Sequence, residues 1–295
     1  MSATRPLPAI LLAALWMAGT IASFSAMAVA GRHVRVELDT FELMTTRSLV
    51  GLLIVLTVAA SRGTWRQIST DRLGLHLARN ICHFTGQNLW FFALPLIPLA
   101  QLFALEFTTP LWVTLLAPLL LAETLTRTKL IAALIGFAGV LVITHPDPAQ
   151  INPGTIAAAL CAIGFAGSVI FTKRLTRTAT ITCIMFWLTG MQAVFGLICG
   201  FADGQFTWPS TAILHWVVIV GCAGLAGHFC LTQALHVAPA SIVMPMDFVR
   251  LPVIALVGLA LYDEPLEWAL LLGGVLIFGG NLMNIRHESR ARRLA

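Results

Sequence analysis

Ionisable side chains interrupt several apolar stretches of this chain, and two of them hold matching positions. Glu106 and Asp247 occupy equivalent places in two related segments, each well inside an apolar run, and Arg250 follows Asp247 by one helical turn. Ionisable groups buried in a membrane are costly, so they usually mark a functional site. We interpret Glu106 and Asp247 as members of a substrate site. The alternative is that Asp247 and Arg250 form an ion pair that only holds helices together.

A polar stripe precedes these carboxylates along one predicted helix, over 73–95. His76, Asn80, His83 and Gln87 recur at helical spacing and therefore share one face. A polar face cannot comfortably contact lipid, so we expect it to line a pathway or to bond to a neighbouring helix. His76 and Arg79, near the start of this helix, are expected at the cytoplasmic interface.

Two more polar residues lie in other apolar runs. Arg47 is about two turns inside the stretch 41–61, where it should face the protein interior or extend to the headgroups. His228 follows Gln87 at the same offset that separates Asp247 from Glu106, so both positions carry a polar side chain. We consider a proton relay or a hydrogen-bonded packing role for this histidine.

The composition determines what kind of protein carries these residues. Of 295 residues, 58% are hydrophobic and 11% are charged, and the mean hydropathy is +0.87. A span needs about 20 apolar residues, and such a composition predicts an all-α polytopic membrane protein. Ten spans are expected at roughly 8–30, 41–61, 73–95, 99–121, 129–145, 153–173, 179–201, 211–236, 240–262 and 266–286.

The charges outside these spans are distributed unevenly. Thirteen Lys and Arg residues fall on the side of the N-terminus, whereas only Arg32 and Arg35 fall on the other side. By the positive-inside rule, both termini should be cytoplasmic. The basic residues are thus a topological signal, and a nucleic-acid partner is not expected.

An internal repeat organises the whole chain. The windows 93–141 and 234–282 align without a gap and share twelve identical residues, including Glu123 with Glu264. Five spans in each half is an odd number, so the second half must insert upside down, which gives two inverted-topology five-helix repeats. We place these repeats at 1–147 and 148–295. Glu123 and Glu264 are expected to have structural roles, such as capping the last helix of each half.

The sequence contains no motif for catalysis or metal binding. There is no HExxH, Walker-type loop or GxSxG, and the six cysteines all fall within predicted spans without zinc spacing. We expect no enzyme activity, no metal and no cofactor. A run near Ala26–Ala28 could be a signal-peptide cleavage site, but the first apolar run is longer than such peptides require.

Taken together, these features resemble the drug/metabolite transporter superfamily, EamA type. The resemblance rests on Thr108-Thr109-Pro110-Leu111 through Glu123 and Gly136–Gly139, and again on Pro252 through Glu264 and Gly279-Gly280. It implies two inverted bundles around a central cavity that work by alternating access. Within the family, the YddG-type amino-acid exporters are the first expectation, and carriers of riboflavin, S-adenosylmethionine or drug-like compounds are the alternative.

This resemblance implies a monomer in the bacterial inner membrane that exports amino acids, aromatic ones included, or related metabolites. A zwitterionic substrate would offer a carboxylate to a guanidinium, an ammonium group to a carboxylate and a side chain to an indole ring. The guanidinium would come from Arg47 or Arg250, and the carboxylate from Glu106 or Asp247. The indole rings would be those of Trp90, Trp112 and Trp187. A lipid-modifying membrane enzyme and a scaffold are disfavoured, because the polar residues are dispersed and lie inside the spans.

Overall fold

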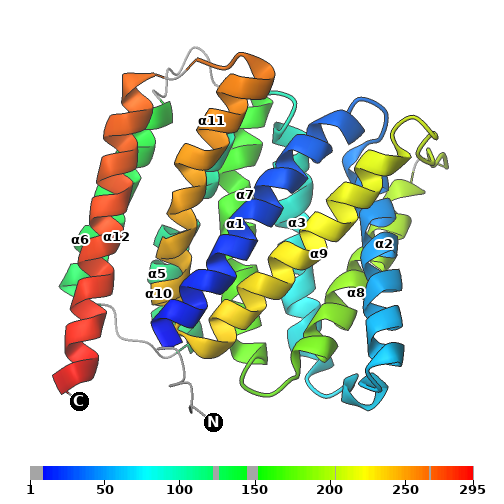
Figure 1. The fold of residues 1–295 in the computed structure, drawn as a ribbon, viewed down its shortest axis with the longest axis horizontal. Helices are drawn as coiled ribbons and strands as arrows, with labels where there is room; N and C mark the ends of the chain where they lie inside the picture. The colour runs from blue at the N-terminus through cyan, green and yellow to red at the C-terminus, as the bar shows by residue number, and fades with distance from the viewer. Residues whose placement is uncertain (1–8, 122–125, 145–151, 203, 266, 295) are drawn as a thin grey trace, which may run out of the picture.

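The computed structural model describes residues 9–121, 126–144, 152–202, 204–265 and 267–294, and every regular element among them is helical. Figure 1 shows these helices running roughly along one direction as a bundle. The elements are α1 (Ala9–Val34), α2 (Thr40–Ser61), η1 (Trp65–Gln67), α3 (Leu73–Ala93), α4 (Leu99–Glu106), α5 (Thr109–Leu121), α6 (Arg127–Thr144), α7 (Pro153–Leu175), α8 (Ile181–Gly200), α9 (Leu214–Val237), α10 (Ala240–Met246), η3 (Asp247–Val249), α11 (Arg250–Tyr262) and α12 (Trp268–Leu294).

Most helix ends agree with the predicted spans to within a few residues, and local capping explains several of them. Asp39 caps α2 and forms a capping box with Glu42, each side chain accepting from the other's backbone N–H. The Asn152 side chain accepts from the third residue of α7, which has Pro153 at its first position. The Thr180 hydroxyl does the same for α8.

Two predicted spans are broken, at equivalent places. The span 99–121 divides into α4 and α5, and the span 240–262 divides into α10, η3 and α11. In the first span, Pro110 lacks the N–H that would bond to the Glu106 carbonyl. The Thr109 hydroxyl donates to that carbonyl instead, at 2.6 Å. The breaks fall beside Glu106 and at Asp247, so the backbone leaves regular α-helix where the buried carboxylates lie.

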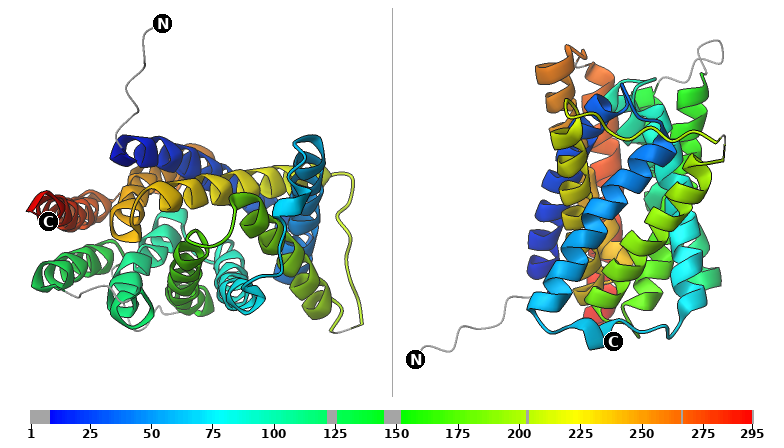
Figure 2. Two further views of the ribbon diagram at one scale, coloured as in Figure 1. Left: turned by 90° about the horizontal axis from the view of Figure 1, so that it is seen from below. Right: turned by 90° about the vertical axis from the view of Figure 1, so that its right-hand side faces the viewer.

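The most extensive helix packing joins segments that are far apart in the sequence. α1 packs along α9, α3 along α7, α2 along α8 and α6 along α12. The pair α6 and α12 forms one edge of the bundle (Figure 1). Seen from the end, α1 in blue and α9 in yellow run side by side (Figure 2). Close approach of α6 and α12 depends on glycines, because a Cβ on Gly139 or Gly273 would collide with the backbone carbonyl of the other.

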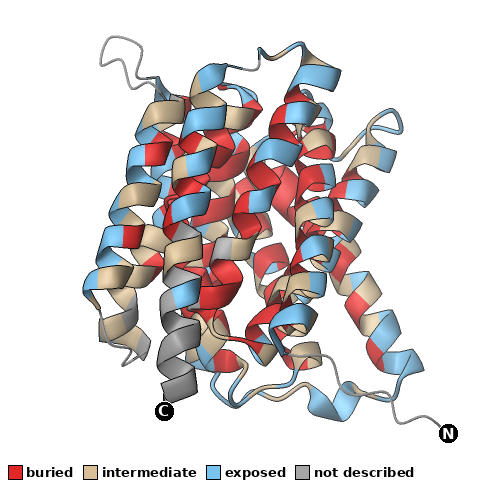
Figure 3. Ribbon diagram, turned by 60° about the vertical axis from the view of Figure 1, so that its left-hand side comes forward, coloured by how far each residue is buried: buried red, intermediate tan, exposed pale blue. Residues whose placement is uncertain are grey.

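The surface of the bundle is apolar and its interior contains many of the polar residues. Figure 3 shows exposed and intermediate residues on the outside of the helices and buried residues between them. Leu53 and Ile198 are both 68% exposed, whereas His76, Asn80 and Thr45 are completely buried. Among the described residues, seven helices or broken helices are long and apolar enough to span a membrane. This inside-out distribution is that of an all-α polytopic membrane protein.

One end of the bundle is held by an ion pair across the two halves of the chain. Arg32, at the end of α1, donates to Glu264 at 2.7 Å and to the carbonyls of Leu94 and Ile97 beyond α3. Glu264 also accepts from the backbone N–H of Leu99, the first residue of α4, at 2.9 Å. Glu264 therefore caps α4, and not the last helix of its own half as the sequence suggested. Its counterpart Glu123 lies outside the described residues.

The same arrangement of a cation on carbonyls occurs in the second half of the chain. Lys173 is the repeat equivalent of Arg32, and it donates to the carbonyls of Leu235 and Ala238, at 2.6 and 2.9 Å. These two residues are in turn the repeat equivalents of Leu94 and Ile97. A cation that binds the last carbonyls of a helix satisfies groups that would otherwise lack partners. The repeat thus preserves an interaction between side chain and backbone as well as helix positions.

We expect Glu264→Gln to destabilise the folded protein by about 1–2 kcal/mol, since it removes a charged partner of Arg32 at a site that is partly screened by solvent. Thermal unfolding in detergent measures this change. Glu267→Gln is the matched control, because Glu267 is exposed in the same loop. Equal melting temperatures for the two variants would show that the pair contributes no stability.

Candidate functional site

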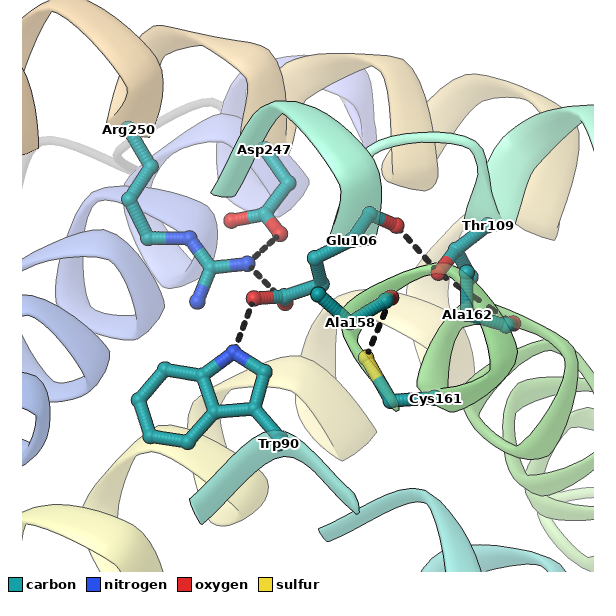
Figure 4. A network of polar contacts seen from close by, with 8 residues as sticks. All are labelled: Trp90, Glu106, Thr109, Ala158, Cys161, Ala162, Asp247 and Arg250. Atoms are coloured by element: carbon teal, nitrogen blue, oxygen red, sulfur yellow. Dashed lines mark hydrogen bonds and ion pairs between the residues drawn. The ribbon is translucent and has the colours of Figure 1, made fainter. Parts of the chain in front are cut away.

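An ion cluster lies at the two helix breaks. Arg250, at the start of α11, donates from Nη2 to Asp247 and to Glu106, both at 2.6 Å. The remaining Glu106 oxygen accepts from the indole N–H of Trp90 on α3, at 2.7 Å. Figure 4 shows the guanidinium of Arg250 between the two carboxylates, with Trp90 on the other side of Glu106. The predicted Asp247–Arg250 pair is therefore present, and it also joins Glu106 of the first half to the second half.

Aromatic rings surround this cluster. The Arg250 guanidinium carbon lies 5.2, 4.8 and 5.3 Å from the ring centres of Phe24, Phe103 and Phe107. At such distances the ring faces attract a cation, and they also exclude water from the ion pairs. Arg250 is only 3% exposed. The two carboxylates share one guanidinium, which leaves one negative charge in excess when all three groups are ionised.

A cavity of about 70 Å³ adjoins the cluster. Small-molecule sites usually measure about 300–1,000 Å³, so a metabolite could enter this cavity only if its lining moved apart. Helices from both halves of the chain line it, and seven of the residues predicted from the sequence are among the lining residues. These are His83, Gln87, Trp90, Glu106, His228, Asp247 and Arg250.

The polar stripe of α3 is directed into the bundle, as expected. Asn80 lies behind the cavity, where its amide donates to the carbonyls of His76 and Trp187 and accepts from Gln192 of α8. Arg47 of α2 is likewise outside the lining, but it donates to Gln87, which is part of the lining. Arg47 is 7% exposed and thus faces the interior. Asn80, Gln87 and Arg47 therefore form hydrogen bonds between helices and also lie at or next to the cavity, so the two roles expected from the sequence do not exclude each other.

Two histidines, one from the stripe and one from α9, meet at the cavity. The rings of His83 and His228 are 4.5 Å apart between centres and nearly perpendicular. Ser168 of α7 lies 3.5 Å from Nδ1 of His83, and Phe24 packs against His228. Nε2 of each histidine is buried without a hydrogen-bond partner among the described residues. These nitrogens can donate to or accept from a ligand in the cavity.

Two predicted tryptophans lie elsewhere. Trp112 of α5 lines a separate groove near α6 and α7, and Trp187 of α8 donates from its indole to the carbonyl of Ser69 in the loop between α2 and α3. Neither belongs to the central cavity. Both were predicted as site residues because they are tryptophans, and the residue type does not say which way the side chain points.

The structure buries His76 and Arg79 between helices, and the sequence analysis missed several lining residues. His76 is completely buried and Arg79 is 2% exposed, and Arg79 lines the cavity. Their depth near the cytoplasmic interface stays a prediction. The hydroxyl of Thr172 on α7 accepts from Nε of Arg79 at 3.2 Å. Phe24 and Phe107 lie in apolar runs, where a phenylalanine does not stand out as a lining residue. Ser168 and Thr172 are polar and one helical turn apart on α7, and this spacing could have indicated which face of α7 points inward.

These features define a class: a polytopic membrane protein with a buried, charged and aromatic cavity beside two broken helices. Residues 11–145 and 152–286 each match the EamA-like transporter family. The chain therefore belongs to the EamA-like transporter family, and it is a transporter of small metabolites rather than an enzyme. The starts of the two matched segments, 11 and 152, are related by the same offset as Glu106 and Asp247, which is the offset of the internal repeat.

Similar proteins extend over nearly the whole chain. A riboflavin transporter of Brucella anthropi is 30% identical over 251 residues, covering 84% of this chain and 88% of its own. An S-adenosylmethionine uptake transporter of Rickettsia bellii is 24% identical over 276 residues, covering 94% of each chain. A solved crystal structure superposes with a TM-score of 0.70 at 21% identity, covering 96% of this chain and 98% of the other, which supports the fold alone.

Proposed function

We propose that this transporter carries S-adenosylmethionine, or a metabolite with a similar cationic centre, inward across the bacterial inner membrane. The observation that supports this substrate class is the pair of buried carboxylates, Glu106 and Asp247, which share the single guanidinium of Arg250. When all three groups are ionised, the cluster has one negative charge in excess, and aromatic rings surround it. Both features favour binding of an organic cation.

The chemistry of S-adenosylmethionine fits this site in three respects. Its sulfonium and ammonium groups suit the acidic cluster, where Oδ1 of Asp247 is buried without a hydrogen-bond partner among the described residues. Its adenine ring suits the aromatic lining that includes Phe107, Phe165 and Trp90. The polar lining from His83, Gln87 and His228 supplies hydrogen bonds for ribose hydroxyls and ring nitrogens.

The transport cycle we propose is alternating access by ten spans in two inverted repeats, 1–147 and 148–295, with both termini cytoplasmic. In the repeat, α1, α2, α3 and α6 correspond to α7, α8, α9 and α12. The contact of α1 with α9 therefore corresponds to that of α7 with α3, and the contacts α2–α8 and α6–α12 each join corresponding helices. Figure 1 shows that α1 begins and α12 ends at the same end of the bundle. The broken helices meet at the centre of this arrangement, where transporters of this kind hold substrates.

Riboflavin is the second candidate, because the relative from Brucella anthropi is a riboflavin transporter and the cavity is aromatic. Riboflavin carries no cation at neutral pH, so it makes no use of the excess negative charge. Amino-acid export, our first expectation from the sequence, gains no support from the relatives named above. We therefore replace it with metabolite uptake.

Uptake by purified protein in proteoliposomes tests the proposal. We expect saturable uptake of labelled S-adenosylmethionine above that of protein-free vesicles, with weaker uptake of riboflavin and of aromatic amino acids. Competition by unlabelled S-adenosylmethionine should remove the signal. Uptake of riboflavin alone would establish the second candidate, and uptake of amino acids alone would return the substrate to our first expectation.

A further inference from the structure

A second charged feature lies beside the cavity, opposite in sign to the acidic cluster. Arg47 and Arg79 are 7% and 2% exposed, and neither has a carboxylate partner among the described residues. Arg32 and Arg250, by contrast, are both held by carboxylates. Two guanidinium groups are thus buried in the bundle without a counter-charge from the described part of the protein.

Among the described residues, Arg47 has hydrogen-bond partners for only one of its three guanidinium nitrogens. Nη1 donates to Oε1 of Gln87 and lies 3.6 Å from the sulfur of Met44, a weak acceptor. Nε is buried without a partner among the described residues. The guanidinium reaches this position because Gly224 of α9 has no side chain, and a Cβ there would lie 2.6 Å from Nη2.

The contacts of Arg79 are also to neutral groups. Nε donates to the hydroxyl of Thr172 at 3.2 Å, and Nη1 donates to the side-chain oxygen of Asn80 at 3.1 Å. Arg79 lines the cavity together with His83 and His228. The wall formed by α3, α7 and α9 at this point therefore offers hydrogen-bond donors and positive charge.

Neutral partners do not replace an anion in such a place. Amide and hydroxyl oxygens satisfy single N–H groups, but a buried charge remains costly unless an opposite charge accompanies it. The cost is larger in a membrane, where buried guanidinium groups are usually paired or face a pathway. A guanidinium group suits carboxylates and phosphates in particular, because two of its N–H groups can donate to two oxygens of the same anion.

We propose that Arg79 and Arg47, with His83 and His228, form a buried anion site at the cavity. The anion is either a carboxylate carried by the substrate or a free inorganic anion that accompanies it. The first source rests on the proposed function, since S-adenosylmethionine bears a carboxylate at one end of its cationic part. In that case the carboxylate lies toward Arg79 and the sulfonium toward Glu106 and Asp247, which fixes the orientation of the substrate in the cavity.

Thermal unfolding of the purified full-length protein with added anions tests the site without reference to transport. Chloride, phosphate and acetate serve as probes, each compared at equal concentration between the wild type and its variants. We expect a saturable rise of the melting temperature in the wild type, with the midpoint concentration at least about tenfold higher in Arg79→Gln. Arg66→Gln is the matched control, since Arg66 is exposed in η1, and it should behave as the wild type.

A second comparison separates the two sources of the anion. S-adenosylmethionine and its decarboxylated analogue differ by the carboxylate alone. If the substrate supplies the anion, Arg79→Gln weakens binding of the first by at least about tenfold and leaves binding of the second unchanged. If a free anion occupies the site, Arg79→Gln weakens the response to an inorganic probe and affects both sulfonium ligands equally.

The site is refuted if Arg79→Gln and the wild type respond equally to every probe. Should Arg79→Gln fail to fold, Arg47→Gln carries the same comparison, and Arg79→Lys should retain an anion response because it keeps the charge. A saturable response to inorganic anions in a protein that does not carry S-adenosylmethionine would refute the proposed substrate and leave the anion site standing. The two proposals can therefore fail separately.

Discussion

Replacement of Arg250 by Met should destabilise the folded protein by about 3–5 kcal/mol, because it leaves two buried carboxylates without their cation. Glu106 and Asp247 both accept from the same Nη2 atom of Arg250, at 2.6 Å. They are buried among aromatic rings at the edge of the cavity, so the water that reaches them replaces the guanidinium only in part. Thermal unfolding in detergent, followed by size-exclusion chromatography, measures this loss.

A neutral triple variant serves as the internal test of this explanation. Glu106→Gln, Asp247→Asn and Arg250→Met together remove all three charges, and we expect them to recover most of the stability lost in Arg250→Met. Arg66→Met, at an exposed position, should melt as the wild type does. If the triple variant is as unstable as Arg250→Met, packing of the Arg250 side chain accounts for its effect and the ion pairs do not.

Asp247→Asn and Glu106→Gln should each lower the rate of uptake by at least about tenfold while the protein stays folded. Either change leaves Arg250 paired with one remaining carboxylate, so the ion cluster becomes neutral and its excess negative charge is lost. A cationic substrate then has no charge to bind. Initial rates of S-adenosylmethionine uptake in proteoliposomes, at matched protein content, measure the effect.

The control for these variants is Asp71→Asn, which neutralises an exposed carboxylate in the loop between η1 and α3. It should transport at the wild-type rate. Riboflavin uptake adds a second control, since a neutral ligand does not need the excess charge and should lose less. Equal rates for all three variants with S-adenosylmethionine would show that the acidic cluster takes no part in substrate binding.

Much of this arrangement follows from local properties of the sequence. Apolar runs of span length predict the helices, and the constant offset between the repeats relates Glu106 to Asp247 and Gln87 to His228. The helical spacing of His83 and Gln87 predicts a common face, which does line the cavity. These inferences need only the period of a helix and the cost of a polar group in lipid.

What the sequence did not provide are the partners between distant segments. Nothing in α4 indicates that Glu106 binds Arg250, a residue 144 positions away. The position of Arg79 near the start of α3 does not indicate that its side chain is buried, because that burial depends on Thr172 and on the packing of α7. The prolines in these two spans, Pro110 and Pro252 among them, do not by themselves give the position of each break. The directions of the Trp112 and Trp187 side chains depend on how each helix is rotated about its own axis. A helix that is apolar on all sides gives no indication of that rotation.

The pairing of α1 with α9 and of α3 with α7 has a consequence for how the protein is made. The ribosome completes α3, with Arg79 and His83 on its polar face, before any of α7, α8 or α9 exists. Helices are inserted in the order of their synthesis. Until α7, α8 and α9 are inserted, the polar face of α3 must therefore be shielded from lipid by the insertion machinery or by other helices of the first half. A nascent chain that stops after its first half would present buried cations to lipid. Such a chain is a natural target for membrane quality control, which would link correct assembly to completion of the second half.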